Sequence, residues 1–206
     1  MSKSKYADNV FINCPFDNKY KPILDAIIFT IFDCGYIARC ALEIDDASQI
    51  RIEKIRYIIS NSKFGIHDIS RTEIDAKSKL PRFNMPLELG MFLSAKYFGT
   101  SRHKVKVCLV LDRQKFRYQK FISDIAGQDV QEHSNSTERV IAIIRNWLRS
   151  SSKRRTIPGG KEISRRYRLF KHDLPKLCKE IRIDEDELTF NDYTNIVSDW
   201  LRMANT

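Results

Sequence analysis

The acid best placed for chemistry in this sequence is Glu88, which stands alone in the apolar stretch RFNMPLELGMFLSAKYFG (82–99). Asn84 is a candidate N-cap and Pro86 suits a first helical turn, so a helix is predicted with Glu88 about one turn from its start. The positive end of the helix dipole favours an ionised carboxylate there. A carboxylate walled by apolar side chains suits stabilising, or attacking, an oxocarbenium-like sugar carbon. The alternative is that Glu88 only satisfies free N–H groups of the first turn.

Further polar residues gather where apolar segments end. Three clusters are present: Asn13, Asp17 and Asn18; His67, Asp68, Ser70 and Arg71; and Arg82, Asn84 and Glu88. In an open parallel sheet, ligands bind outside the carboxyl ends of the strands, near the topological switch point. The three clusters are therefore expected to converge on one cleft. His67 lies inside its predicted strand and points opposite to Asp68, which favours a core histidine.

A fourth polar run, SDIAGQDVQEH (123–133), supplies Asp124, Gln128, Asp129 and His133. These residues are able to reach the same cleft, or the cleft of a neighbouring subunit. The alternative is ordinary loop chemistry, in which Gly127 makes a turn and Asp129 caps it.

The elements that must position these residues alternate along the chain. Strands are predicted at 9–14, 36–42, 64–70 and 104–112, and helices at 20–34, 48–62, 82–99, 114–127 and 137–150. This alternation, with near-continuous apolar strands, predicts parallel βαβ units covered on both faces. We expect a doubly wound, flavodoxin-like α/β domain of about five mostly parallel strands in residues 1–150. A basic linker (151–160) and a small helical appendage (161–206), its first helix split at Pro175, follow.

Composition narrows the class of protein. No apolar run approaches the roughly 18–20 residues that span a bilayer, and the start of the chain has no signal-peptide pattern. A cytoplasmic location is therefore expected. The five cysteines form no C-x-x-C pair and are interpreted as reduced thiols, and no Cys/His spacing predicts a metal. No nucleotide-binding glycine motif is present either.

Three segments resemble nucleoside 2-deoxyribosyltransferases. VFINCPFD (10–17) is similar to their first strand and its Pro–Phe turn, MPLELGMFLSAKYFG (85–99) to the helix that carries their catalytic glutamate, and FGIHDIS (64–70) to their third strand. The resemblance covers about residues 9–111 and is specific at the E-L-G helix. That family is related in fold to TIR domains, whose catalytic glutamate cleaves the nicotinamide–ribose bond of NAD.

This resemblance implies roles for individual residues. Glu88 would be the nucleophile or cation stabiliser, and Asp68 would orient the leaving base or the sugar. Asn13, Pro15 and Phe16 would line the pocket. The transferases place an acid and a G-T pair just before the glutamate, where this chain has Arg82-Phe83-Asn84-Met85.

An arginine in place of that acid favours an anionic substrate, namely a nucleotide or a dinucleotide such as NAD, and Ser70 and Arg71 are candidate phosphate ligands. The departure also leaves open a pocket that has lost activity. No resident cofactor is implied. The resemblance further suggests a homo-oligomer and a toxic effector role in bacterial anti-phage defence.

The net charge of +10 is concentrated locally. Residues 151–172 hold eight basic residues against one acid, Glu162, and include Arg154, Arg155, Arg165 and Arg166. Such a strip is suited to the phosphate backbone of nucleic acid, and the alternative is a solvated linker and helix face. Three functions therefore stay open: an N-glycosidase acting on NAD or a nucleotide, a non-catalytic nucleotide or second-messenger binder, and a nucleic-acid-associated subunit.

Overall fold

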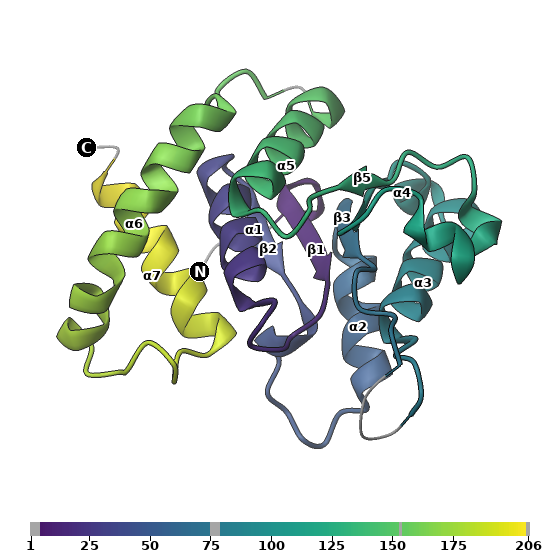
Figure 1. Ribbon diagram of the computed structural model, residues 1–206, viewed down its shortest axis with the longest axis horizontal. Helices are drawn as coiled ribbons and strands as arrows, with labels where there is room; N and C mark the ends of the chain where they lie inside the picture. Colours follow the sequence, from purple (N-terminus) through teal and green to yellow (C-terminus); the bar gives the residue numbers. More distant parts are fainter. Residues whose placement is uncertain (1–4, 75–78, 153, 205–206) are drawn as a thin grey trace.

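A computed structural model describes residues 5–74, 79–152 and 154–204 (Figure 1). Within these residues five strands form one parallel sheet, in the order β2-β1-β3-β4-β5. The strands are β1 (Asn9–Asn13), β2 (Ile37–Arg39), β3 (Phe64–Asp68), β4 (Val107–Asp112) and β5 (Gln131–Glu132). The order reverses direction beside β1, which puts the switch point between the carboxyl ends of β1 and β3. The predicted doubly wound α/β class is confirmed.

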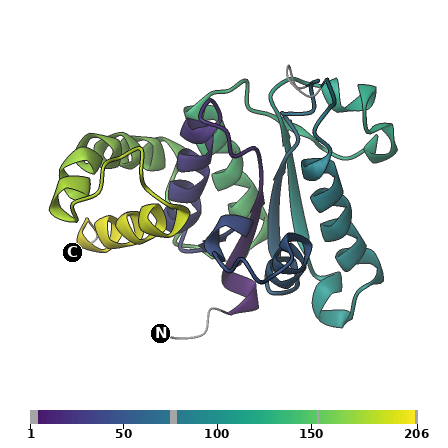
Figure 2. The same cartoon turned by 90° about the horizontal axis from the view of Figure 1, so that it is seen from below.

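Helices cover both faces of the sheet (Figure 2). The helices are α1 (Lys21–Asp33), α2 (Arg51–Ser60), α3 (Asn84–Phe98), α4 (Ser101–Lys104), α5 (Thr137–Ser151), α6 (Gly160–Glu180) and α7 (Phe190–Met203). Helices α1 and α5 pack on one face, while α2 and α3 pack on the other. All five residues of β1 and of β3 are buried, which explains why their sequences are almost continuously apolar.

The last two helices share their core with the sheet. Phe170 of α6 is fully buried and lies against Phe29 of α1, with ring centroids 5.3 Å apart, and Trp200 of α7 contacts both rings. Residues of α6 and α7 therefore belong to the same apolar cluster as those of β1, α1 and α5. The C-terminal helices cover α1 and α5 as an outer layer on that face of the sheet.

Two local predictions are wrong. Segment 114–127 forms only the short 3₁₀ turns η3 (Arg117–Lys120) and η4 (Ser123–Ile125), because its apolar residues Tyr118 and Ile125 pack beneath the strand ends rather than along one helical face. Pro175 does not split the C-terminal run, since α6 continues through it to Glu180. Asp173, which precedes Pro175 by two residues, accepts a hydrogen bond from Trp200 Nε1 at 3.0 Å.

Most arginines of the basic strip are engaged within the chain, while Lys153 lies outside the described residues. Arg154 pairs with Asp8 at 2.5 Å and stacks over the ring of Tyr36. Arg165 pairs with Glu162 on the surface of α6. Arg155 is exposed in the linker. Much of the strip therefore attaches the linker and α6 to the rest of the protein, and its binding of nucleic acid stays a prediction.

Arg166 makes the most buried of these ion pairs, and its loss is expected to weaken the fold. Arg166 Nη1 lies 3.3 Å from Asp33 Oδ1, with side chains 13% and 2% exposed. Burial raises the pKa of Asp33 to about 6, and the charge of Arg166 opposes that rise. Replacing Arg166 by alanine leaves a buried carboxylate unpaired, so at pH 8 we expect a loss of about 2–3 kcal/mol in free energy of unfolding.

The loss should shrink at pH 5, where Asp33 is protonated. Urea denaturation at both pH values measures the difference. Arg165→Ala is the matched control, because its ion pair is fully exposed and should cost nothing measurable. Equal losses for the two variants would contradict the assignment.

Candidate active site

A hollow of about 290 Å³ lies beside the switch point, where β1 ends and α3 begins. Seven of the predicted site residues line it: Asn13, Pro15, Phe16, Asp17, Arg82, Asn84 and Glu88. Cys14, Arg51 and Met85 complete the lining. The loop after β1 and the first turns of α3 therefore meet here, as the topology of the sheet requires.

Glu88 is the most unusual of these side chains. It is 6% exposed, and within the described residues its carboxylate makes no hydrogen bond and no ion pair. Burial raises the pKa of Glu88 from its ordinary 4.5 to about 7, and the positive charge of Arg51 opposes this rise. The carboxyl group is thus poised to change charge near neutral pH while facing a hollow.

The helix start explains why Glu88 is not a capping residue. Helix α3 begins at Asn84 itself, its N-cap is Phe83, and no side chain caps it, so the expected capping role of Asn84 is wrong. The N–H of Leu87 already donates to the carbonyl of Phe83 at 2.9 Å. Glu88 follows in the second turn, beyond the free N–H groups. Glu88 therefore does not serve to satisfy free N–H groups of the first turn.

Asn13 is held rigidly at the floor of the hollow. Its Nδ2 donates to the carbonyl of Met85 at 2.8 Å and lies 3.0 Å from His67 Nδ1. His67 is fully buried, and burial together with the charge of Lys106 lowers its pKa to about 3, so it stays neutral and accepts from Asn13. This confirms His67 as a core histidine. Both amide hydrogens of Asn13 are used, which leaves its Oδ1 to accept from a ligand.

A second, larger hollow of about 700 Å³ adjoins the first and shares Asp17 and Arg82 with it. Four cations, Lys19, Arg71, Arg82 and Arg113, line it against two acids, Asp17 and Glu73. Arg71 pairs with Asp17 at 3.0 Å and Arg113 pairs with Glu73. Arg82 is exposed and has no ion-pair partner in the described part of the chain. Its guanidinium is available to an anionic ligand such as a phosphate.

Asp17 also builds the site. Its Oδ1 accepts from the N–H groups of Lys19 at 3.1 Å and Tyr20 at 3.2 Å, which fixes the turn that leads into α1. The ion pair with Arg71 connects this turn to the segment after β3. Asp17 and Arg71 were predicted as substrate ligands, and the structure places both on the lining while giving them a partner in each other.

Asp68 and Ser70 depart from the prediction, because both lie beneath the site and line neither hollow. Asp68 is fully buried, and its Oδ2 accepts from the hydroxyl of Tyr20 at 2.5 Å and lies 2.9 Å from Nε2 of His133. Its Oδ1 accepts from the N–H of Ser70 at 2.8 Å, and the Ser70 hydroxyl is 3.0 Å from His133 Nε2. The carboxylate of Asp68 is therefore held by partners within the chain and does not face either hollow.

His133 joins this buried network rather than the cleft. Its Nδ1 accepts from the N–H of Asn135 at 3.1 Å, so Nε2 carries the proton and donates towards Asp68. The network ties the start of α1, the end of β3 and the segment after β5 to one carboxylate. Gln128 and Asp129 line a different hollow on the edge of the sheet, and neither they nor Asp124 line the cleft.

Two arginines are among the lining residues that were missed from the sequence. Arg51 is the first residue of α2 and lines the Glu88 hollow, and Arg113 follows β4 and lines the larger one. A signal existed for Arg113, since it comes directly after a strand whose carboxyl end faces the cleft. Arg51 gave no such signal, because its position depends on how the loop after β2 folds back.

The chain was compared with models of known protein families, with curated proteins and with solved structures, and none of the three comparisons found a match. In the described ranges no helix is long and apolar enough to cross a membrane. The same ranges hold no group of three or more His, Cys, Asp or Glu side chains arranged to bind a metal ion.

Proposed function

We propose that this protein cleaves the bond between a ribose and a nitrogenous base in an anionic nucleotide, with NAD as the preferred class of substrate. The observation that carries the proposal is the buried, unpaired carboxyl group of Glu88 on a hollow of about 290 Å³. Burying an ionised carboxylate without a partner lowers the stability of the fold. A ligand that carries positive charge, such as a cationic sugar carbon, would supply the missing partner.

The adjoining basic hollow supports a charged substrate. Arg82 lies on both hollows, so a nucleotide whose sugar reaches Glu88 would present its phosphates to Arg82 and the neighbouring cations. A neutral nucleoside would leave these charges without a partner. This favours a nucleotide or dinucleotide over the deoxynucleosides that transferases use.

The burial of Asp68 favours a pyridinium base. With Asp68 beneath the site, Glu88 and Asp17 are the acids on the smaller hollow, and Asp17 is paired with Arg71. Adenine needs a proton to leave as a neutral molecule, whereas a nicotinamide attached through its pyridinium nitrogen takes the bonding electron pair and leaves neutral. Glu88 would stabilise or attack the resulting cation at the sugar carbon, and water would complete hydrolysis, releasing one proton.

The experiment is to incubate the purified protein separately with NAD, nicotinamide mononucleotide, ATP and deoxyadenosine and to quantify free base by chromatography. We expect release from the two pyridinium nucleotides, less from ATP and least from deoxyadenosine. Binding of a nucleotide without release from any of the four would instead support the second candidate, a nucleotide-binding module. That candidate is favoured because, among the described residues that line the smaller hollow, the other acid, Asp17, is paired with Arg71.

Base release should rise with pH. Glu88 must be ionised to stabilise a cation, and its pKa is about 7 because of burial. The fraction of ionised Glu88 therefore increases about tenfold from pH 5 to pH 6 and levels off above pH 8. A profile of kcat/KM between pH 5 and 9 measures this. A rate that is flat over this range, or that falls as the pH rises through 7, would contradict the assigned role.

Arg82 is expected to act on binding rather than on the chemical step. Replacing Arg82 by alanine should raise KM for NAD about tenfold, corresponding to roughly 1.4 kcal/mol, with a small change in kcat. Arg155→Ala is the matched control, since Arg155 is exposed and lies in the linker away from both hollows. Steady-state kinetics of the two variants measure this difference. Equal KM values would show that Arg82 does not bind the substrate.

A further inference from the structure

The edge of the sheet at β4 is only partly covered. β5 pairs with Leu111 and Asp112, whereas β4 begins at Val107. The N–H of Val107 donates to Lys63 on the β3 side at 3.0 Å, and the carbonyl of Asp112 accepts from His133 on the opposite side at 3.0 Å. Backbone groups alternate along a strand, so the N–H and C=O of Cys108 face the same side as Asp112. The described residues supply no strand there.

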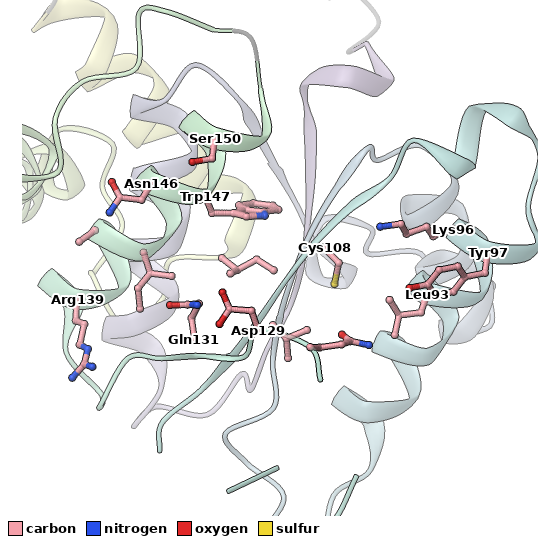
Figure 3. A pocket seen from close by; sticks show the side chains of 15 residues that line it. Leu93, Lys96, Tyr97, Cys108, Asp129, Gln131, Arg139, Asn146, Trp147 and Ser150 are labelled. Carbon is pink, nitrogen blue, oxygen red and sulfur yellow. The ribbon is translucent and has the colours of Figure 1, made fainter. Parts of the chain in front are cut away.

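A hollow of about 600 Å³ lies along this uncovered edge (Figure 3). Cys108, Leu109 and Val110 of β4 form its floor. Helix α3 supplies Leu93 and Tyr97 on one side of the strands, and helix α5 supplies Trp147 on the other. Ile143 of α5 also lines the hollow. We call this space the edge slot. The two helices cover opposite faces of the sheet and both reach the lining, so the edge slot continues the layer of the sheet beside β4.

The charges at the two ends of the edge slot are both positive. Lys96 lies in the last turn of α3, near the start of β4, and within the described residues it makes no ion pair. Arg139 lies in the first turn of α5, near β5, where its Nη2 is 3.8 Å from Glu132 Oε2 and its Nη1 donates to the Ser134 hydroxyl at 3.1 Å. Asp129 is the acid on the lining. Asp129 and Gln131 lie between the two helices, the helices themselves present apolar side chains to the edge slot, and its two ends carry positive charge.

We propose that the edge slot binds an extended peptide segment of a partner protein, apolar in its middle and acidic at its ends, which adds a strand to β4. Free backbone donors and acceptors on a sheet edge recognise an extended backbone, and the flanking walls select the side chains. At about 3.3 Å per residue, roughly four to six residues would fill the uncovered edge. None of the residues that line the edge slot lines either hollow of the candidate active site.

The test begins with a displayed library of random ten-residue peptides, selected on the full chain. Counter-selection uses Ile143→Lys, which puts a charge on the α5 wall. Tyr97→Lys does the same on the α3 wall, where the side chain is 61% exposed, so folding is not at risk. Ile52→Lys on α2, outside the edge slot, is the matched control. We expect enriched peptides with an apolar centre and acidic ends, bound at least tenfold more weakly by both wall variants and normally by the control.

The backbone contact is tested on the synthesised best peptide. Its binding should slow hydrogen exchange at the amides of Cys108 and Val110, and N-methylation of its central residues should weaken binding at least tenfold. Either no enrichment over the wall variants, or equal binding of the N-methylated peptide, would overturn the proposal. So would a dimer of this chain that Tyr97→Lys dissociates and no peptide displaces, because the occupant would then be a second copy.

Discussion

Replacing Glu88 by glutamine is expected to make the protein more stable than the wild type as the pH rises. Burial holds the folded-state pKa of Glu88 at about 7, against an ordinary 4.5. Below pH 4.5 the acid is neutral in both the folded and unfolded protein, and it imposes no charge penalty. Between about pH 4.5 and 7 the unfolded chain ionises while the folded one still holds the proton, so stability falls over this range and levels off above it.

A pKa difference of this size corresponds to about 3 kcal/mol. The free energy of unfolding of Glu88→Gln minus that of the wild type should therefore increase by about 3 kcal/mol between pH 4 and pH 8. Other ionisable groups titrate alike in both proteins and cancel in the difference. Urea denaturation across this range measures it, and Glu53→Gln on the exposed side of α2 is the control with no expected increase. A constant difference would show that Glu88 is not a buried, unpaired acid.

The second large effect is expected from Asp68→Ala. The substitution removes the acceptor for Tyr20, the Ser70 N–H and His133, which are all buried around it. Each buried donor left without a partner costs about 1–3 kcal/mol, so we expect a loss of about 4 kcal/mol or more in free energy of unfolding.

Asp68→Asn should lose less free energy of unfolding than Asp68→Ala, because its amide oxygen can still accept a hydrogen bond. Some loss should remain, because its NH₂ group faces a donor. Asp129→Ala is the matched control: an exposed acid whose removal should change stability by less than about 0.5 kcal/mol. Equilibrium urea curves of the three variants give the comparison. If Asp68→Ala were as stable as Asp129→Ala, Asp68 would not be the centre of the network.

Periodicity was enough to predict most of the fold. Strands β1 and β3 are buried throughout and β4 is buried over its last four residues, so all three have apolar sequences. The apolar stripes of α1, α2 and α5 follow helical spacing. Strand β5 was not predicted, because it has only two residues, Gln131 and Glu132, and forms through its pairing with β4. Pro175 was misread because the packing of Phe170 and Leu174 continues α6 across it.

The site was predictable only where it follows from strand ends. Asn13, Asp17 and Glu88 meet because parallel strands end at one edge of the sheet. The position of Asp68 depends on His133, which lies far along the chain and reaches it only through the β4–β5 connection. No local sequence pattern shows that a carboxylate after a strand will form a buried hydrogen bond with a distant histidine. The edge slot could not be predicted from the sequence either, because it exists only where β5 is too short to cover β4.

The central claim is that Glu88 stabilises or attacks the sugar carbon of a bound nucleotide. The most direct test is to measure the release of nicotinamide from NAD by the wild type and by Glu88→Gln, at equal concentration and pH 8. The wild type should release nicotinamide in proportion to enzyme, and the variant should be slower by roughly 10³-fold or more while remaining folded. Release at the same rate by both proteins, or by neither, would contradict the proposed chemistry.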